Sequence, residues 1–131
     1  MKKWGEKLKR LIPALIILAI TIGIFIGSYY YVNATCKEAT KLIDECIDEY
    51  KENGTTINKA KEFKDYWDKK EKTLSIFVNH IAIDEIEVSV AELSYHSNFK
   101  DNTMFYDSAI RIKTLIHQIL EDTKVTAHSI F

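Results

Sequence analysis

Four residues near the middle of the chain combine an imidazole with oxygen donors and are the best candidates for chemistry. They lie where one predicted helix ends and the next begins: Asn79, His80, Asp84 and Glu85. A histidine beside carboxylates can bind a metal ion or titrate near neutral pH. No second closely spaced His or Cys completes a metal motif, so a structural role is favoured: His80 complements a helix C-terminus and Asp84 caps the next helix. We predict a weak binding site here, without a metal ion or cofactor.

Catalysis finds no support in the sequence, which has no GxSxG, no HExxH and no glycine-rich phosphate loop. The other histidines, His96, His117 and His128, are scattered singly. Cys36 and Cys46 lie on one predicted helix, roughly 15 Å apart, whereas the Cα atoms of a disulfide lie within ~7 Å. We interpret both as small buried hydrophobic residues; the alternative is an intermolecular disulfide across a parallel dimer. We predict no catalytic residue.

The segment that organises the chain is residues 11–32, which contains no charge, seven isoleucines and three leucines. At ~1.5 Å per residue it makes a helix of roughly 33 Å, about the thickness of the hydrocarbon core of a bilayer. Pro13 is expected in the first helical turn, where its missing N–H costs little. We predict one transmembrane helix.

The flanking charges predict its orientation. Five Lys or Arg residues and one Glu precede the segment, whereas acids and lysines are mixed after it. The positive flank stays in the cytoplasm, and the aromatic residues Trp4 and 29–31 suit the two membrane interfaces. We therefore expect residues 1–10 to be cytoplasmic and residues 33–131 to lie outside the cell membrane.

A cleaved signal peptide is the alternative, because Val32-Asn33-Ala34 has the small residues that a signal peptidase requires. The apolar run is longer than the ~7 to 15 residues of a signal peptide, so we prefer an uncleaved anchor. Both alternatives export the rest of the chain.

Small residues recur along one face of the predicted membrane helix at Ala19, Gly23 and Gly27. A small-xxx-small stripe lets a second helix approach closely. We hypothesise that it packs against a second copy or a partner helix; the alternative is that glycine is simply common in membrane helices.

Residues after 32 form one small domain by length and helices by composition. They carry 13 basic and 18 acidic groups, so binding to nucleic acid is not expected. No proline and only one glycine occur there, which favours long helices with few turns.

Hydrophobic spacing predicts four helices in this domain. Their ranges are 35–53, 56–81, 84–97 and 103–123. The second is expected to be the longest, and only its 70/71 step lacks an apolar residue. The third is expected to begin at Asp84, with Glu87 completing a capping box, and residues 125–131 are expected to dock on the bundle. The predicted fold class is all-α: one N-terminal transmembrane helix and an antiparallel bundle of about four helices, the first continuous with the anchor.

A family resemblance emerges over residues 67–93. Trp67, the run LSIFVNH (74–80), IDEI (83–86) and VSVAEL (88–93) resemble the bacterial family called domain of unknown function 4363, and the chain's end, HSIF, does so too. The resemblance implies a membrane-anchored protein with a helical domain, mainly in Gram-positive spore-forming bacteria, and no known activity. Asn79 stands where members carry an acid before the histidine, which argues against an ion site built on that acid.

Two functions are compatible with these features. The first is an interaction protein, an accessory or scaffold subunit for another membrane or envelope protein, or a homo-oligomer. The second is an exported sensory or binding module for a small ligand or a cation. With ten residues before the membrane helix, either would need a partner to signal inward. We prefer the interaction protein.

Overall fold

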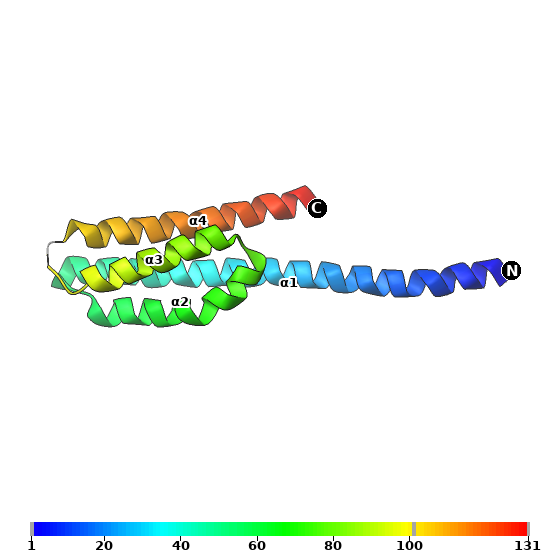
Figure 1. Cartoon of the computed structure of the whole chain (residues 1–131), viewed down its shortest axis with the longest axis horizontal. Coiled ribbons are helices and arrows are strands. Elements are labelled where there is room, and N and C mark those ends of the chain that lie inside the picture. The colour runs from blue at the N-terminus through cyan, green and yellow to red at the C-terminus, as the bar shows by residue number, and fades with distance from the viewer. Residues whose placement is uncertain (1, 101, 131) are drawn as a thin grey trace. The chain divides into compact units, whose positions relative to one another are not determined.

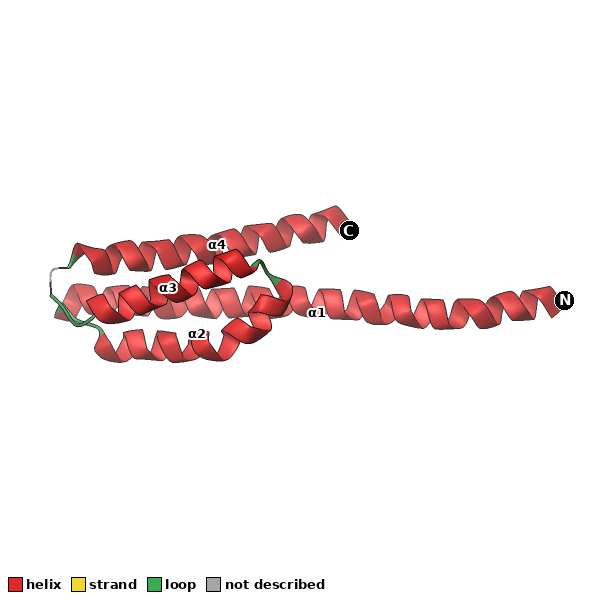
Figure 2. Cartoon of the chain, viewed as in Figure 1, coloured by secondary structure: helices red, strands yellow, loops and turns green. Residues whose placement is uncertain are grey.

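The chain folds into helices joined by short turns. The computed structural model describes residues 2–100 and 102–130, with helices α1 (Lys2–Asn53), α2 (Ile57–Phe77), α3 (His80–His96) and α4 (Thr103–Ile130) (Figure 1). Figure 2 shows the helices and the turns that join them. The predicted all-α fold class is confirmed. The described residues form two compact units, one ending at Tyr31 and the other beginning at Val32.

The first unit contains the apolar part of α1, whose large apolar side chains are exposed. An 18-residue window of this helix has a mean hydropathy of 2.5, and none of the window is buried. Two of its hydroxyls donate to the helix itself: Thr21 Oγ1 to the Ile17 carbonyl and Ser28 Oγ to the Phe25 carbonyl, both at 2.8 Å. Hydroxyls satisfied in this way suit a lipid environment, where an unpaired polar group is costly. The segment is therefore a candidate membrane span, and a signal sequence has the same features.

The expected position of Pro13 in a first turn is wrong, because α1 begins at Lys2 and Pro13 lies inside it. Proline cannot donate to the carbonyl four residues earlier, which here belongs to Lys9. Lys9 lies among the charged residues before the apolar run, where water can bind that carbonyl. The helix therefore continues through the proline.

The second unit is a helical bundle with an apolar core. Three helix pairs are linked by charged groups or hydrogen bonds: Lys59 Nζ lies 3.5 Å from Glu45, Lys113 Nζ lies 2.6 Å from Asp44, and Arg111 lies 3.3 Å from Glu92. The predicted inward stripes of α1 and α3 are confirmed. The core residues that define them are Cys36, Ala39, Ile43, Cys46 and Tyr50 on α1, and Ile86, Val90 and Leu93 on α3.

The boundary between α2 and α3 differs from the prediction. The cap of α3 is Asn79, whose side-chain oxygen accepts from the Ile81 amide at 2.9 Å, and not Asp84. Asparagine is as good a cap as aspartate, and an earlier start adds Ile83 to the buried face. α2 consequently ends at Phe77 and has 21 residues, so α4 with 28 residues is the longest helix after α1.

Tyr50 organises the end of the bundle where α1 stops. Its hydroxyl donates to the Phe99 carbonyl at 2.6 Å and accepts from the Asn102 amide at 2.9 Å. Its ring stacks on Phe105 with centroids 4.0 Å apart. Gly54 ends α1 as predicted, with φ of 76°, which a glycine adopts without strain. We call this end the Tyr50 end.

The prediction for the C-terminus is wrong in its described part. α4 continues past residue 123 to Ile130, and Val125 on it is 62% exposed. Ile110 on the same helix is 59% exposed. The predicted docking of the Ile130 and Phe131 side chains lies outside the described residues.

Candidate functional site

The four candidate residues between α2 and α3 do not converge on one point. Asn79 caps α3, and Glu85 lines a different hollow from His80, one of about 460 Å³ beside Arg111. His80 and Asp84 do line a common hollow of about 160 Å³. The residues around it are Glu71, Lys72, Ser75, His80, Ile83, Asp84 and Glu87.

Glu71 is the residue of this hollow that sequence reasoning missed. It occupies the 70/71 step where the apolar pattern of α2 is interrupted, and that interruption was the available signal. Its Oε2 atom is buried without a hydrogen-bond partner among the described residues. Burial, followed by the charges of Glu87 and Asp68, raises the pKa of the Glu71 carboxyl, and Lys72 partly opposes this. The hollow is therefore acidic and holds a carboxylate that binds a proton more readily than usual.

This arrangement is a poor cation site. Over the residues that the structure describes, no group of three or more His, Cys, Asp or Glu side chains is placed to hold a metal ion. His80 is exposed at the first position of α3, where a positive charge is not favoured by the helix dipole. Of the four candidates, all of them described residues, only Asn79 has a structural role, as the cap of α3; the predicted role of His80 at a helix C-terminus is wrong, because His80 is the first residue of α3.

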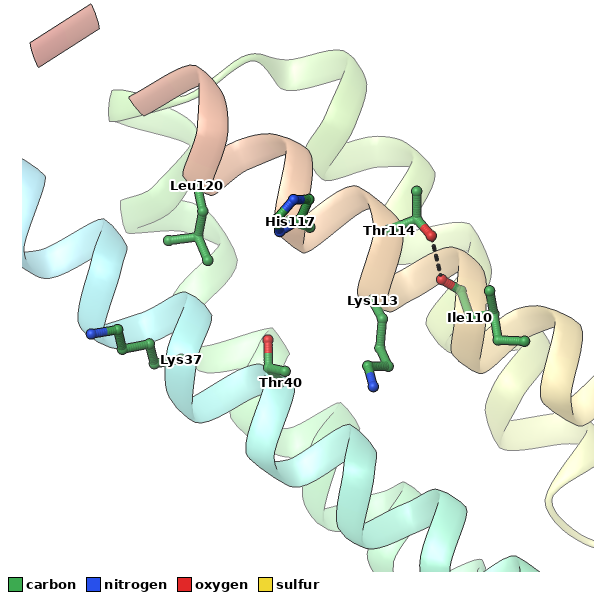
Figure 3. A pocket seen from close by; sticks show the side chains of 7 residues that line it. All are labelled: Lys37, Thr40, Ile110, Lys113, Thr114, His117 and Leu120. Atoms are coloured by element: carbon green, nitrogen blue, oxygen red, sulfur yellow. Dashed lines mark hydrogen bonds between the residues drawn. The ribbon is translucent and has the colours of Figure 1, made fainter. Parts of the chain in front are cut away.

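A larger hollow lies between the second-unit part of α1 and α4 (Figure 3). This α1–α4 groove has a volume of about 610 Å³, within the range of small-molecule and peptide sites. Figure 3 shows the side chains of Lys113 and Leu120 extending from α4 toward α1. Its lining residues are Lys37 and Thr40 on α1, and Ile110, Lys113, Thr114, His117 and Leu120 on α4.

The groove combines cationic groups with an apolar surface. Lys113 Nζ lies 2.6 Å from Asp44, whereas His117 lies 3.8 Å from Glu121 on its own helix. Ile110 is 59% exposed and gives the groove an apolar side. An acidic segment with apolar side chains would complement this surface. Sequence reasoning missed the groove because residues from two distant segments form it.

The small-residue stripe of α1 is open in the structure. A Cβ atom added at Gly23 or at Gly27 would meet no atom within 4 Å beyond the helix's own backbone. The stripe is thus available for close helix packing, and the hypothesis that it packs against another helix stays a prediction.

These features define a class: a helical bundle preceded by a long, exposed, apolar N-terminal helix. Within that class, the chain belongs to the family described as domain of unknown function (DUF4363), whose model matches residues 26–130. The match includes the whole bundle and the last residues of the apolar segment. No curated protein and no solved structure matches the chain. The resemblance of residues 67–93 to this family is therefore confirmed, and it brings no activity with it.

Proposed function

We propose that this protein is a membrane-anchored interaction module, an accessory or scaffold subunit that presents its helical bundle at the outer face of a bacterial cell membrane. The observation that carries the proposal is the exposed apolar segment of α1, which is long enough to cross a bilayer and is joined to the bundle without a break. The basic residues before this segment support a cytoplasmic N-terminus.

The bundle itself supports retention over cleavage. A signal peptidase would have to cut after Ala34, inside a continuous helix. Val32, Thr35 and Cys36 on either side of that bond are buried in the bundle. A peptidase needs an extended and accessible chain, so cleavage here would have to occur during export, before the bundle folds.

The α1–α4 groove is the proposed partner site. Its exposed Ile110 and Lys37 suit an amphipathic helix of the partner that carries carboxylates beside apolar side chains, while Lys113 pairs with Asp44. Charge complementarity of this kind favours a specific orientation and a fast encounter.

The test is co-purification of the tagged chain from gently solubilised native membranes, with partners identified by mass spectrometry. The groove variant is Lys37→Glu with Ile110→Glu, two exposed positions of the groove. The matched control is Lys61→Glu with Ile57→Glu, two exposed positions on α2. We expect a stoichiometric partner with the natural chain and the control, and at least ~10-fold less with the groove variant, equivalent to ~1.4 kcal/mol. Equal recovery with both variants would contradict the groove as partner site, and recovery of the chain alone would contradict an accessory subunit.

A second function is favoured by the size of the same groove. At about 610 Å³ it could hold a small anionic amphiphile, whose charged group would approach Lys37 and Lys113. This is the exported binding module. A thermal-shift screen with fatty acids would then raise Tm for the natural chain and not for the groove variant, while an interaction protein requires no such shift.

A further inference from the structure

The turn between α2 and α3 exposes large apolar side chains. Ile76 is 74% exposed and Ile81 is 66% exposed, and Phe77 between them is 42% exposed. We call residues 76–81 the α2–α3 elbow. Exposed isoleucines this close together are unusual on a surface that faces only water.

The elbow lies at the end of the bundle that α1 enters. Lys59 near the start of α2 contacts Glu45, and Tyr66 further along α2 reaches the Thr35 carbonyl with its hydroxyl at 3.5 Å. α2 therefore runs antiparallel to this part of α1. Its last residue, Phe77, consequently lies closer than Tyr66 to the end of the bundle that contains Val32. In Figure 1 the elbow lies opposite the turn that joins α1 to α2.

Covalent connection brings this end of the bundle to the membrane. The bundle begins at Val32, and the uncharged apolar segment ends at the same residue in sequence. Lys69, Lys70 and Lys72 occupy the turns of α2 before the elbow, where anionic headgroups would meet them. Acids lie at this end as well: Glu71, Asp84 and Glu87 line the hollow beside His80, so the membrane contact rests on the apolar side chains and not on a net positive charge.

We propose that the α2–α3 elbow is a second membrane contact, which inserts Ile76 and Ile81 into the interfacial layer of the bilayer. The inference rests on the proposed function, since it needs the apolar segment to be in the membrane. A single membrane span leaves the bundle free to change its tilt relative to the membrane. A second contact at the elbow fixes that tilt. The α1–α4 groove would then face partners in a defined direction.

The test places an environment-sensitive fluorophore, nitrobenzoxadiazole, on single introduced cysteines of the full chain in bilayers of phosphatidylglycerol and phosphatidylethanolamine. The positions are Ile76→Cys and Ile81→Cys in the elbow, Ile57→Cys at the opposite end of the bundle as control, and Ile17→Cys in the apolar segment as reference. All four side chains are more than half exposed in the structure.

The native thiols do not interfere with this labelling. Cys36 and Cys46 are buried, and burial raises the pKa of each thiol to about 12. Because the thiolate is the reactive form, neither reacts with the label in the folded chain at neutral pH.

We expect lipids with a nitroxide on the upper acyl chain to quench the labels at 76 and 81, with a blue shift, and to leave the label at 57 unchanged. Labels at 76 and 81 that resemble the one at 57 would overturn the elbow contact. A blue shift without quenching would overturn it too, because a second copy or another protein would then cover the elbow. The label at 17 separately tests the anchor: if it escapes quenching, the proposed function fails, while quenching at 76 and 81 still decides the elbow.

Discussion

Glu71 is a carboxylate on the otherwise apolar inward face of α2, and it destabilises the bundle when it is ionised. Its Oε2 atom is buried without a hydrogen-bond partner among the described residues, and Glu87, Asp68 and Asp84 add negative charge around it. The pKa of this carboxyl is raised in the folded chain, chiefly by burial. The folded state therefore binds the proton more tightly than the unfolded chain does, so stability falls as pH rises through the folded pKa.

Glu71→Gln should accordingly stabilise the bundle at pH 7. The amide resembles the protonated acid and carries no charge to desolvate. We expect Tm to rise by roughly 2–4 °C, as for ~0.5 kcal/mol in a domain of this size, and the difference to vanish near pH 3, which lies about one unit below the ordinary pKa of Glu, so that the carboxyl is mostly protonated in both states. Thermal unfolding followed by circular dichroism at about pH 3 to 8 measures this. Exposed Glu38→Gln is the control, and a Tm gain at Glu71 that is the same at every pH would contradict the account.

At the scale of elements, the Tyr50 end holds three helices together. One hydroxyl satisfies a carbonyl and an amide of the α3–α4 turn, and one ring stacks on α4. Thr56 before α2 adds a backbone hydrogen bond to Ser97 after α3 at 3.1 Å. These bonds satisfy backbone groups that the helix ends leave unpaired.

Tyr50→Phe should destabilise the bundle by about 1–3 kcal/mol, because it leaves the Phe99 carbonyl and the Asn102 amide without this partner. The expected fall in Tm is roughly 4 °C or more. Tyr95→Phe is the control, since that ring is 64% exposed. Equal melting temperatures for the two variants would show that the hydroxyl contributes little.

The small-residue stripe makes a second prediction at this scale. If Gly23 and Gly27 allow close packing with another membrane helix, Gly23→Ile with Gly27→Ile should abolish that association in a reporter assay of membrane helices. Ile22→Leu with Ile26→Leu keeps volume on a neighbouring face and should preserve it. Unchanged association in the glycine variant would reject the stripe as a packing surface.

The sequence predicted that these segments are helices more accurately than it predicted the residues at which the helices begin and end. The stripe of Ile86, Val90 and Leu93 follows from helical spacing and is buried as expected. The start of α3 was misplaced because Asp84 and Glu87 match a capping box, a local pattern that also occurs inside a helix. The actual cap of α3, Asn79, follows the end of α2 at Phe77 by two residues, and the earlier start places Ile83 in the core, a packing advantage that no local pattern reveals.

The candidate site was predicted less well, for a physical reason. His80 and Asp84 are close in sequence and do share a hollow, but its most perturbed group, Glu71, comes from the preceding helix. The α1–α4 groove joins Lys37 to Lys113, and only the tertiary fold brings such distant positions together. Ile110, an exposed residue of α4, lines this groove.

Anchoring of the whole molecule requires that the apolar segment stays attached to the bundle. The family model reaches into this segment at residue 26, so the family domain includes residues that would lie in the membrane.

The most direct measurement is protease accessibility of a chain tagged at both ends, in protoplasts of a Gram-positive host. The intact mass of the recovered chain is measured alongside. We predict that added protease removes the C-terminal tag and spares the N-terminal tag, and that the intact mass before digestion includes residues 1–34. A chain recovered from the medium with Thr35 as its first residue would contradict the anchor and leave an exported soluble bundle instead.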